Sequence, residues 1–332
     1  MKSNLITRLL TEIIKKTLTI LRSIVVYLGV AFLIFFFLSF FVGISGLSQP
    51  TSKKYYAEKE ILNQGGDQKI VIANLSGMIL SSAQSSLFVT EDIISPERIE
   101  NIFLQAKSDP QVKAIIFDIY SPGGSPVASD RIYELINNFK NDTKIPVIFL
   151  LSDLAASGAY YIASASDFII ANPASLTGSI GVIMETYNLE GLYDKIGVSK
   201  NTFKQGEYKD ILSESRDITD EETEIINALN QNTYDLFVSR VADGRRLDLD
   251  YVRSLADGKI LSGKQAYELK LIDGLGNTDE AVYQAKKLAN LDRAIVVKYQ
   301  KTSLWAELMG APTITSALNQ VLYLPSQIWQ QK

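Results

Sequence analysis

The stretch Pro146–Tyr161, PVIFLLSDLAASGAYY, decides the fold. It begins as an apolar run typical of a buried strand and changes to small residues around Ser157 before a helical pattern starts. Similar runs, separated by helical patterns, predict further strands. They lie at Ile70–Leu75, Ala114–Ile119, Phe168–Ala171, Ile180–Glu185 and Lys200–Lys204. Strands that are apolar on both faces and separated by helices predict an α/β core with largely parallel pairing.

Helix signals surround these strands. Ser95 is placed to cap a helix with Pro96 at its first position, and a second helix is predicted from about Val127 to Phe139. Beyond the acidic helix start at Thr219 the pattern is mostly helical. We expect one long helix ending near Asp243-Gly244, two shorter helices and a last strand at Ala294–Tyr299.

The N-terminal part contains a candidate membrane anchor. From Ile24 to Leu47 the chain has no charged residue, and about 20 helical residues suffice to cross a bilayer. A cleaved secretory signal is the alternative, but this apolar region is long for one and no clear A-x-A site follows it. Residues 5–20 have apolar residues at helical spacing, which suits an interfacial helix or an extension of the anchor.

Charge around this span predicts its orientation. Five basic residues precede it against the single acid Glu12, which places the N-terminus in the cytoplasm and the bulk of the chain outside. The predicted divisions are a cytoplasmic segment 1–23, a transmembrane helix 24–47, a linker 48–67, an extracytoplasmic domain 68–300 and a C-terminal tail 301–332. No role is predicted for the tail.

Composition restricts the chemistry. The 332 residues are 46% apolar and 21% charged, as in globular proteins, and a net charge of -4 gives no sign of nucleic-acid binding. The chain has no cysteine and no histidine, which excludes disulfides, thiolate and His-based metal sites, and Ser-His-Asp catalysis. A hydrolase using an activated hydroxyl would therefore need lysine, a carboxylate or an N-terminal amine as its base.

Two small-residue segments follow predicted strands. In Ser121-Pro122-Gly123-Gly124-Ser125 the glycines permit an unusual backbone path, so their N–H groups could stabilise an oxyanion, although an ordinary strand-to-helix turn reads the same. In Asp153–Tyr161, Ser157 lies where a strand turns into a helix, so its hydroxyl could be activated as a nucleophile. The alternative there is close packing of a helix on the sheet.

A third segment, Gly206–Ile211, contains Lys209. Most lysines are solvated surface groups. A lysine acts as a base near neutral pH only if its pKa falls from ~10.4 toward ~7–8, which requires an apolar pocket and hydroxyls to orient it. Ser179 in Thr177–Val182 is a candidate for that orienting hydroxyl, or it is a polar residue in a turn that opens a strand.

Together these segments resemble the signal peptide peptidase A family of Ser-Lys serine peptidases, in its short single-repeat form, with a ClpP/crotonase-like fold. The resemblance rests on SPGGS, AASGAYY, NPASLTGSIGV, YKDILS and ADGKILSGKQAYELKLIDGLG, in order, between about Lys69 and Val297. It implies a repeated ββα core with a helical C-terminal part. It also implies that Ser157 is the nucleophile, Lys209 the base, the Gly124 amide an oxyanion donor and Ser179 the lysine-orienting hydroxyl, with Gly123 and Ser125 binding substrate.

The resemblance further implies a membrane-anchored endopeptidase that digests signal peptide remnants without a metal or cofactor. Family members form dome-like rings in which serine and lysine come from neighbouring subunits, so we expect a homo-oligomer, with an octamer as one form, and an inactive monomer. Pro126 lacks a backbone N–H directly after SPGGS, which predicts altered substrate pairing there.

Three alternatives stay open. A related membrane Ser-Lys peptidase could act on a regulatory protein, and an inactive scaffold could bind membrane peptides. A crotonase-type protein acting on acyl-CoA would also use backbone amides as an oxyanion hole, but an outward-facing domain argues against a cytoplasmic substrate.

Overall fold

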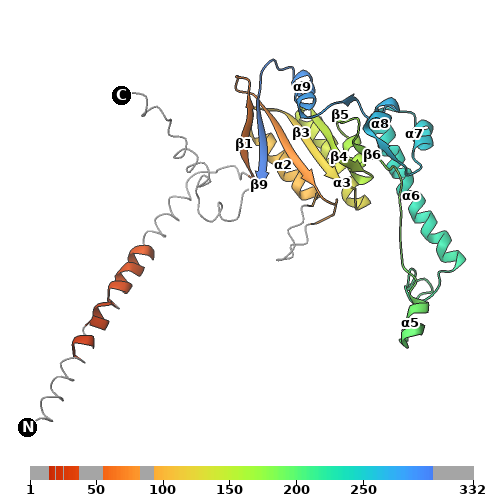
Figure 1. Ribbon diagram of the computed structural model, residues 1–332, viewed down its shortest axis with the longest axis horizontal. Coiled ribbons are helices and arrows are strands. Elements are labelled where there is room, and N and C mark those ends of the chain that lie inside the picture. Colours follow the sequence, from red (N-terminus) through yellow and green to blue (C-terminus); the bar gives the residue numbers. More distant parts are fainter. Residues whose placement is uncertain (1–14, 19, 25, 37–54, 83–92, 302–332) are drawn as a thin grey trace, which may run out of the picture. The chain divides into compact units, whose positions relative to one another are not determined.

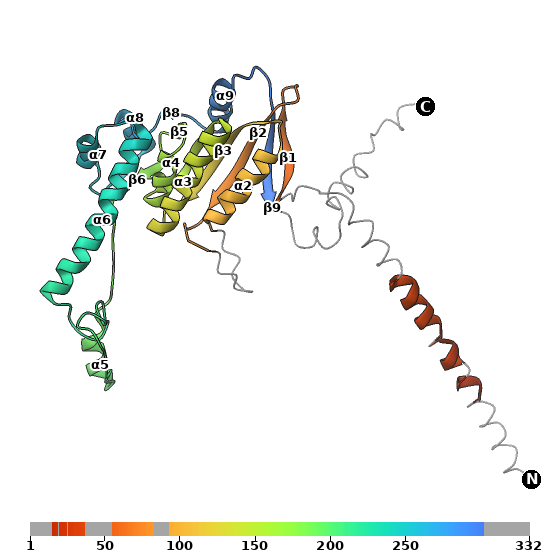
Figure 2. The ribbon, with the colours of Figure 1, turned by 180° about the vertical axis from the view of Figure 1, so that it is seen from behind.

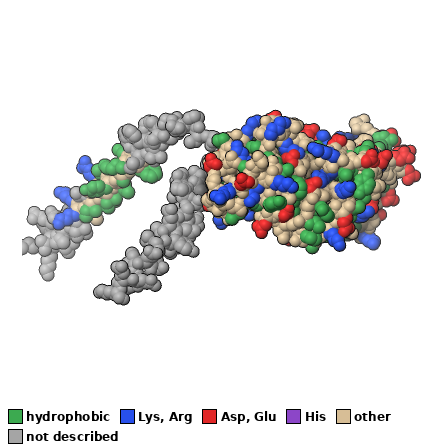
Figure 3. Space-filling view, turned by 90° about the horizontal axis from the view of Figure 1, so that it is seen from above, with side chains coloured by type: hydrophobic (Ala, Val, Ile, Leu, Met, Phe, Trp, Pro, Cys, Tyr) green, Lys and Arg blue, Asp and Glu red, His purple; other side chains and the backbone are tan. Residues whose placement is uncertain are grey.

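The computed structural model describes residues 15–18, 20–24, 26–36, 55–82 and 93–301. It has two units, residues 1–53 and 54–332. In the first unit a helix runs over Lys15–Phe36 and is long and apolar enough to cross a membrane. Figure 3 shows it covered by apolar side chains, with basic side chains toward one end. The helix begins before the predicted span 24–47, as expected if residues up to 20 extend the anchor. Residues 37–47 lie outside the described part.

The second unit is built on one mixed sheet (Figure 1). Its described strands are β1 (Tyr56–Asn63), β2 (Lys69–Ser76), β3 (Val112–Ser121), β4 (Val147–Ala156), β5 (Phe168–Ala171), β6 (Leu176–Gly178), β7 (Ile260–Ser262), β8 (Gly274–Leu275) and β9 (Ile295–Lys301). Their order is β1-β9-β2-β3-β4-β5-β8, with β6 paired to the end of β4 and to β7. Pairing is parallel except at β1–β9 and β6–β7.

Helices cover both faces of this sheet. The described helices of this unit are α2 (Pro96–Ser108), α3 (Pro126–Thr143), α4 (Gly158–Ser164), α5 (Glu190–Ile196), α6 (Asp220–Arg245), α7 (Leu249–Leu255), α8 (Gly263–Glu268) and α9 (Thr278–Leu288), of which α5 lies away from the sheet (Figure 1). Figure 2 shows α2 and α3 side by side over one face, where Phe117 and Phe149 are fully buried beneath them. On the other face α9 packs Ala281 and Ala285 against the sheet. This architecture confirms the predicted α/β fold with a helical C-terminal part.

Most predicted elements are confirmed. The four strands from Ile70 to Ala171 are β2 to β5, and the last strand is β9. Ser95 caps α2, and Thr219 forms a capping box with Glu222 at the start of α6. The pattern after α6 yields three short helices rather than two.

The strands predicted at Ile180–Glu185 and Lys200–Lys204 are wrong. The Ile180 carbonyl accepts from the Gly258 amide at 3.0 Å, but the backbone of residues 181–188 makes no hydrogen bond to another strand in the described chain. These residues enter a projection, residues 182–219, that we call the arm (Figure 1). The apolar runs indicated extended backbone, but a strand also needs a partner, and the described residues of this chain provide none there.

The linker predicted over residues 48–67 is also partly wrong. Residues Tyr56–Asn63 form β1, an edge strand antiparallel to β9, and the Tyr56 ring stacks on Tyr299 with centroids 5.7 Å apart. Most of β1 is exposed, so backbone pairing holds it and its side chains carry little apolar signal. Tail residues 302–332 lie outside the described part.

Candidate active site

Ser157 occupies a strained turn at the end of β4. Its φ of 55° and ψ of -122° are unusual for a residue with a side chain, and such conformations cost about 1–3 kcal/mol. Two backbone hydrogen bonds of 2.9 Å hold the turn, from the Ser157 amide to the Gly178 carbonyl and from the Tyr161 amide to the Ser157 carbonyl. The hydroxyl makes no capping bond to α4, so it is left available at a half-buried position.

Gly123 and Gly124 follow β3 and pack directly against this turn. A Cβ on Gly123 would lie 2.7 Å from the Gly158 nitrogen and 2.9 Å from the Ser157 Cβ. A Cβ on Gly124 would lie 2.2 Å from the Ile79 carbonyl oxygen. Both residues also have positive φ, at 102° and 153°. Glycine is therefore required at both positions, for backbone conformation and for close approach.

Two backbone amides beside Ser157 have no acceptor in the described part of the chain. One belongs to Gly124, whose nitrogen is 3.3 Å from where a Gly158 Cβ would lie. The other belongs to Gly158 itself. On its other side the glycine loop is fixed, since Ile79 donates to Gly123 at 2.9 Å and accepts from Ser125 at 2.8 Å. Sequence reasoning gave Gly158 no role, although its place directly after Ser157 was a usable signal.

Ser179 and Ser157 line one cavity of about 1000 Å³. Ser179 also has positive φ, at 52°, and its amide donates to the Lys259 carbonyl at 2.9 Å. Gly124, Gly158 and Ile183 lie on the same cavity wall. The structure therefore brings together four of the predicted site residues: Ser157, Gly123, Gly124 and Ser179.

Ser125 and Pro126 form the N-terminus of α3. The Ser125 hydroxyl accepts from the Ala128 amide at 3.3 Å as the N-cap of α3, and Pro126 is the first helical residue. The first helical position needs no N–H donor, so Pro126 removes no hydrogen bond from the fold. The Ser125 amide donates to the Ile79 carbonyl, so this backbone N–H is already hydrogen-bonded within the chain.

A charged network that includes Asp130 and Tyr161 borders the cavity. The Tyr161 hydroxyl donates to Asp130 Oδ1 at 2.8 Å, and Arg240 Nε donates to the same oxygen at 2.9 Å. Burial, then the Asp130 carboxylate, raises the pKa of Tyr161 well above its usual value. Tyr161 therefore stays protonated and donates its hydrogen bond over the accessible pH range.

Lys209 is not part of this cavity. It is exposed and lies in a run of turns on the arm. The arm buries little against its own chain, since α5 buries none of its residues and Phe203 is 97% exposed. The structure of one copy thus separates Ser157 from the lysine predicted as its base.

Comparisons with known proteins agree with this geometry. The profile of the family described as Peptidase family S49 matches residues 139–292. A protein of Enterococcus faecium assigned as signal peptide peptidase SppA is 36% identical over 257 residues, covering 75% of this chain and 73% of that protein. This chain belongs to peptidase family S49. It is a serine endopeptidase by that membership.

Two further comparisons concern this S49 peptidase. The protein slr0021 of Synechocystis, assigned as a protease, is 43% identical over 189 residues, covering 57% of this chain and 68% of that protein. A solved structure of the membrane-bound stomatin-specific protease 1510-N with a substrate peptide is 18% identical, with a TM-score of 0.46, covering 73% of this chain and 96% of that one.

In the described residues of this S49 peptidase, no group of three or more Asp and Glu side chains is placed to hold a metal ion. Acidic and basic side chains are interspersed over the face of the folded unit seen in Figure 3.

Proposed function

We propose that this chain is a membrane-anchored endopeptidase in which Ser157 is the nucleophile and Lys209 the general base. The observation that carries the proposal is the strained Ser157 turn packed against Gly123 and Gly124, with a free hydroxyl next to two unused amides. Strained backbone at a serine that lines a cavity is typical of catalytic nucleophiles. S49 membership supports the same assignment.

The proposed reaction uses only groups of the protein. Neutral Lys209 takes the Ser157 proton while Oγ attacks the peptide carbonyl, and the amides of Gly124 and Gly158 donate to the oxyanion. Protonated Lys209 then gives its proton to the departing amine, and water hydrolyses the acyl-enzyme. Ser179, on the cavity wall with Ser157, orients the lysine amine.

The base comes from a second copy in this proposal. One copy keeps Lys209 on the arm, while side chains there are left in solvent, with Ile183 82% and Tyr187 81% exposed. Burying one large apolar side chain contributes about 1.5–3 kcal/mol. A ring of identical chains would bury these side chains and bring each arm to the next cavity, so an isolated copy would be inactive.

Membrane attachment sets the substrate class. The helix Lys15–Phe36 would anchor the chain with its N-terminus in the cytoplasm, by the excess of basic residues around its start, and hold the peptidase unit outside. Peptides that remain in the membrane after secretion are then within reach. The relative assigned as signal peptide peptidase SppA supports such remnants as substrates. Gly123 and Ser125 would contact the bound peptide.

The test is cleavage of a mixed peptide library by the detergent-solubilised chain, followed by mass spectrometry. Ser157→Ala and Lys209→Ala should each remove cleavage while the protein stays folded. Ser254→Ala and Lys287→Ala, at exposed helical positions, are matched controls that should cleave as wild type does. Cleavage by a folded Ser157→Ala variant would overturn the nucleophile, and cleavage by Lys209→Ala would overturn the base.

Two readouts separate this function from its alternatives. A serine-reactive fluorophosphonate should label wild type at Ser157, whereas an inactive scaffold would not be labelled. Adding signal peptides and soluble regulatory proteins to the library then separates degradation of remnants from cleavage of a regulatory target.

A further inference from the structure

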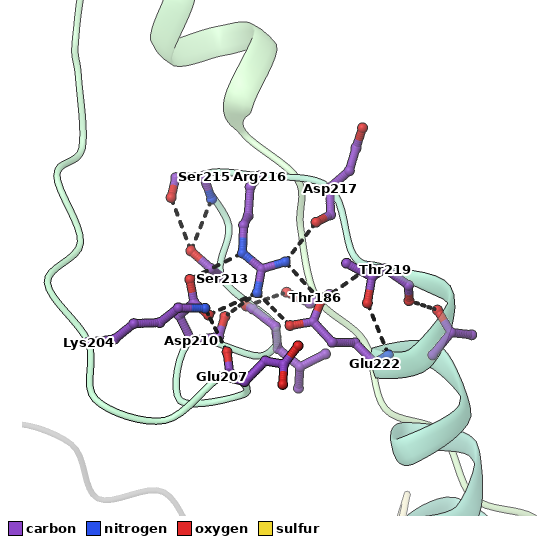
Figure 4. A network of polar contacts seen from close by, with 12 residues as sticks. Thr186, Lys204, Glu207, Asp210, Ser213, Ser215, Arg216, Asp217, Thr219 and Glu222 are labelled. Atoms are coloured by element: carbon purple, nitrogen blue, oxygen red, sulfur yellow. Dashed lines mark hydrogen bonds and ion pairs between the residues drawn. The ribbon is translucent and has the colours of Figure 1, made fainter.

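A dense ion network lies at the base of the turn that carries Lys209. Consecutive turns hold this stretch, from the Lys209 amide to the Gly206 carbonyl at 3.3 Å and from the Ser213 amide to the Asp210 carbonyl at 3.0 Å. Figure 4 shows the guanidinium of Arg216 between this turn and the first turn of α6. One side chain thus joins the lysine turn to a long helix.

Arg216 uses both edges of its guanidinium. Toward the lysine turn, Nε and Nη2 donate to the two carboxylate oxygens of Asp210 at 3.1 and 2.9 Å. Toward α6, Nη1 donates to Glu222 Oε2 at 2.8 Å, and Nη2 donates to Glu222 Oε1. Nη1 also donates to the Asp217 carbonyl at 2.9 Å. Paired Arg–carboxylate bonds of this kind fix orientation as well as distance.

Both acids in the network are shielded. The Glu222 side chain is 4% exposed and closes the α6 capping box by accepting from the Thr219 amide at 3.0 Å, and the Asp210 side chain is 16% exposed. The Arg216 guanidinium holds the pKa of Asp210 well below its usual range and lowers that of Glu222 to about 2. Both therefore stay ionised at any pH where a peptidase would act.

Two lysines close to Lys209 in sequence are paired with carboxylates of the arm. Lys204 donates to Asp210 at 2.6 Å and Lys200 to Glu214 at 2.7 Å. The Lys209 ammonium, like the Glu207 carboxylate, has no hydrogen-bond or ion-pair partner among the residues described. The neighbouring titratable groups are Lys204, Glu207, Tyr208 and Asp210 on its turn, Glu214, Arg216 and Asp217 after it, Glu222 on α6 and Glu185 on the arm's first stretch. Asp210 directly follows Lys209 in sequence, and its carboxylate is already paired with Arg216 and Lys204.

We infer that Arg216 is a positioning residue for catalysis: it fixes the Lys209 turn on α6 and engages Asp210, so that this carboxylate does not hold a proton on Lys209. The inference rests on the proposed function, in which Lys209 must be neutral to accept the Ser157 proton. A lysine with an ionised carboxylate beside it keeps its proton to higher pH. Arg216 thereby favours the reactive form of a residue that it does not itself touch.

Arg216→Gln tests both parts of the inference, the positioning of the Lys209 turn and the engagement of Asp210. It releases Asp210, so the activity of the assembled chain should need a pH about 1 unit higher, and kcat at neutral pH should fall about tenfold or more with KM little changed. Arg216→Lys keeps the charge without the paired bonds, so its pH profile should stay near that of wild type while kcat falls. Lys107→Gln removes a positive charge from an exposed pair with Asp142 on another element, and should behave as wild type does.

The double variant Arg216→Gln/Asp210→Asn isolates the electrostatic part. With Asp210 neutral nothing is released to hold the Lys209 proton, so the alkaline shift should disappear although the network is broken. If a variant fails to assemble, the pH dependence of Lys209 labelling by an amine reagent, read by mass spectrometry, gives the same comparison without turnover.

An unshifted profile and an unshifted labelling curve in Arg216→Gln would overturn the inference, as would a shift that persists in the double variant. Lys209→Ala assayed in parallel separates this from failure of the proposed function. If Lys209→Ala still cleaves peptides, the base assignment fails; if it is inactive while Arg216→Gln shows no shift, only the inference about Arg216 fails.

Discussion

The sheet and the arm of this peptidase are held in opposite ways. The sheet that carries Ser157 is fixed by burial, with Phe117 and Phe149 fully enclosed and their rings 5.1 Å apart. The arm that carries Lys209 has apolar side chains in solvent, and ion pairs around Arg216 hold the turn that carries Lys209 on α6. One half of the proposed catalytic pair thus lies in a unit complete within one chain, and the other in a segment that uses little of its own chain for support.

This difference shows where assembly can act. A nucleophile turn that costs strain needs a rigid, close-packed surrounding, which the chain supplies alone. A base that must be neutral needs a dry pocket, which the solvated arm of a single copy lacks. Joining the two only on assembly would keep peptidase activity from appearing in isolated chains.

The largest difference, in the free energy of unfolding, is expected between two Phe→Ala variants. Phe149→Ala, in the core, should lower the free energy of unfolding by about 3–5 kcal/mol. Phe203→Ala, on the arm, should change it by less than about 0.5 kcal/mol in dilute protein, because the ring is already in solvent. Denaturant unfolding measures both. Phe203→Ala should instead weaken self-association in sedimentation experiments, and unchanged association would remove Phe203 from the proposed contact.

The next difference, in kcat, is expected between two Gly→Ala variants. Gly124→Ala should lower kcat about 100- to 1000-fold, because its Cβ would displace the amide proposed as an oxyanion donor away from Ile79. Gly191→Ala, inside α5, has no atom within 4 Å of the added Cβ and should leave kcat unchanged while slightly favouring the helix. Steady-state kinetics decides this, and near-normal kcat in Gly124→Ala would contradict the assignment.

Acid should affect the arm before the sheet. The folded pKa values of Asp210 and Glu222 are lowered, so their contribution to stability is present above the usual carboxylate range near pH 4 and is lost as pH falls toward about 2, the pKa of Glu222. Hydrogen exchange should show amides of residues 206–222 losing protection over this range while β3 and β4 keep theirs. Simultaneous loss of protection in both regions would show that the Arg216 network does not stabilise residues 206–222.

The smallest effect is expected at a helix cap. Ser125→Ala removes the hydroxyl that accepts from the Ala128 amide and should cost about 1 kcal/mol of stability. Activity should fall only as far as the glycine loop loosens. If thermal unfolding is unchanged but KM rises strongly, the hydroxyl contacts substrate and its main role is not the cap.

Sequence patterns predicted the buried part of the fold well and the exposed part poorly. Apolar runs such as Ala114–Ile119 mark strands because both of their faces are covered by the same chain. The run Ile180–Glu185 looks alike, yet the described residues of one copy provide no strand to pair with it, and composition carries no information about that. The prediction at β1 is wrong in the opposite direction: a strand forms where a linker was predicted. An exposed edge strand needs only backbone pairing and therefore no apolar run.

The site was predictable where it depends on local backbone. The glycine pair and the Ser157 turn follow from small residues after strands, and the structure brings them together. The role of Arg216 could not be read from sequence, because its network depends on how the turn folds against α6. Lys209 could not be placed beside Ser157 from the sequence, because in one copy it lies exposed on the arm and outside the cavity that Ser157 lines.

Mixing two inactive variants tests the central claim most directly. Ser157→Ala and Lys209→Ala, each inactive alone, would be combined in detergent, allowed to exchange subunits and assayed on the same peptide. Joining serine and lysine from different copies predicts recovered activity, about a quarter of wild type per site for random mixing in equal amounts. No recovery, with exchange verified by differently tagged chains, would contradict a site shared between copies.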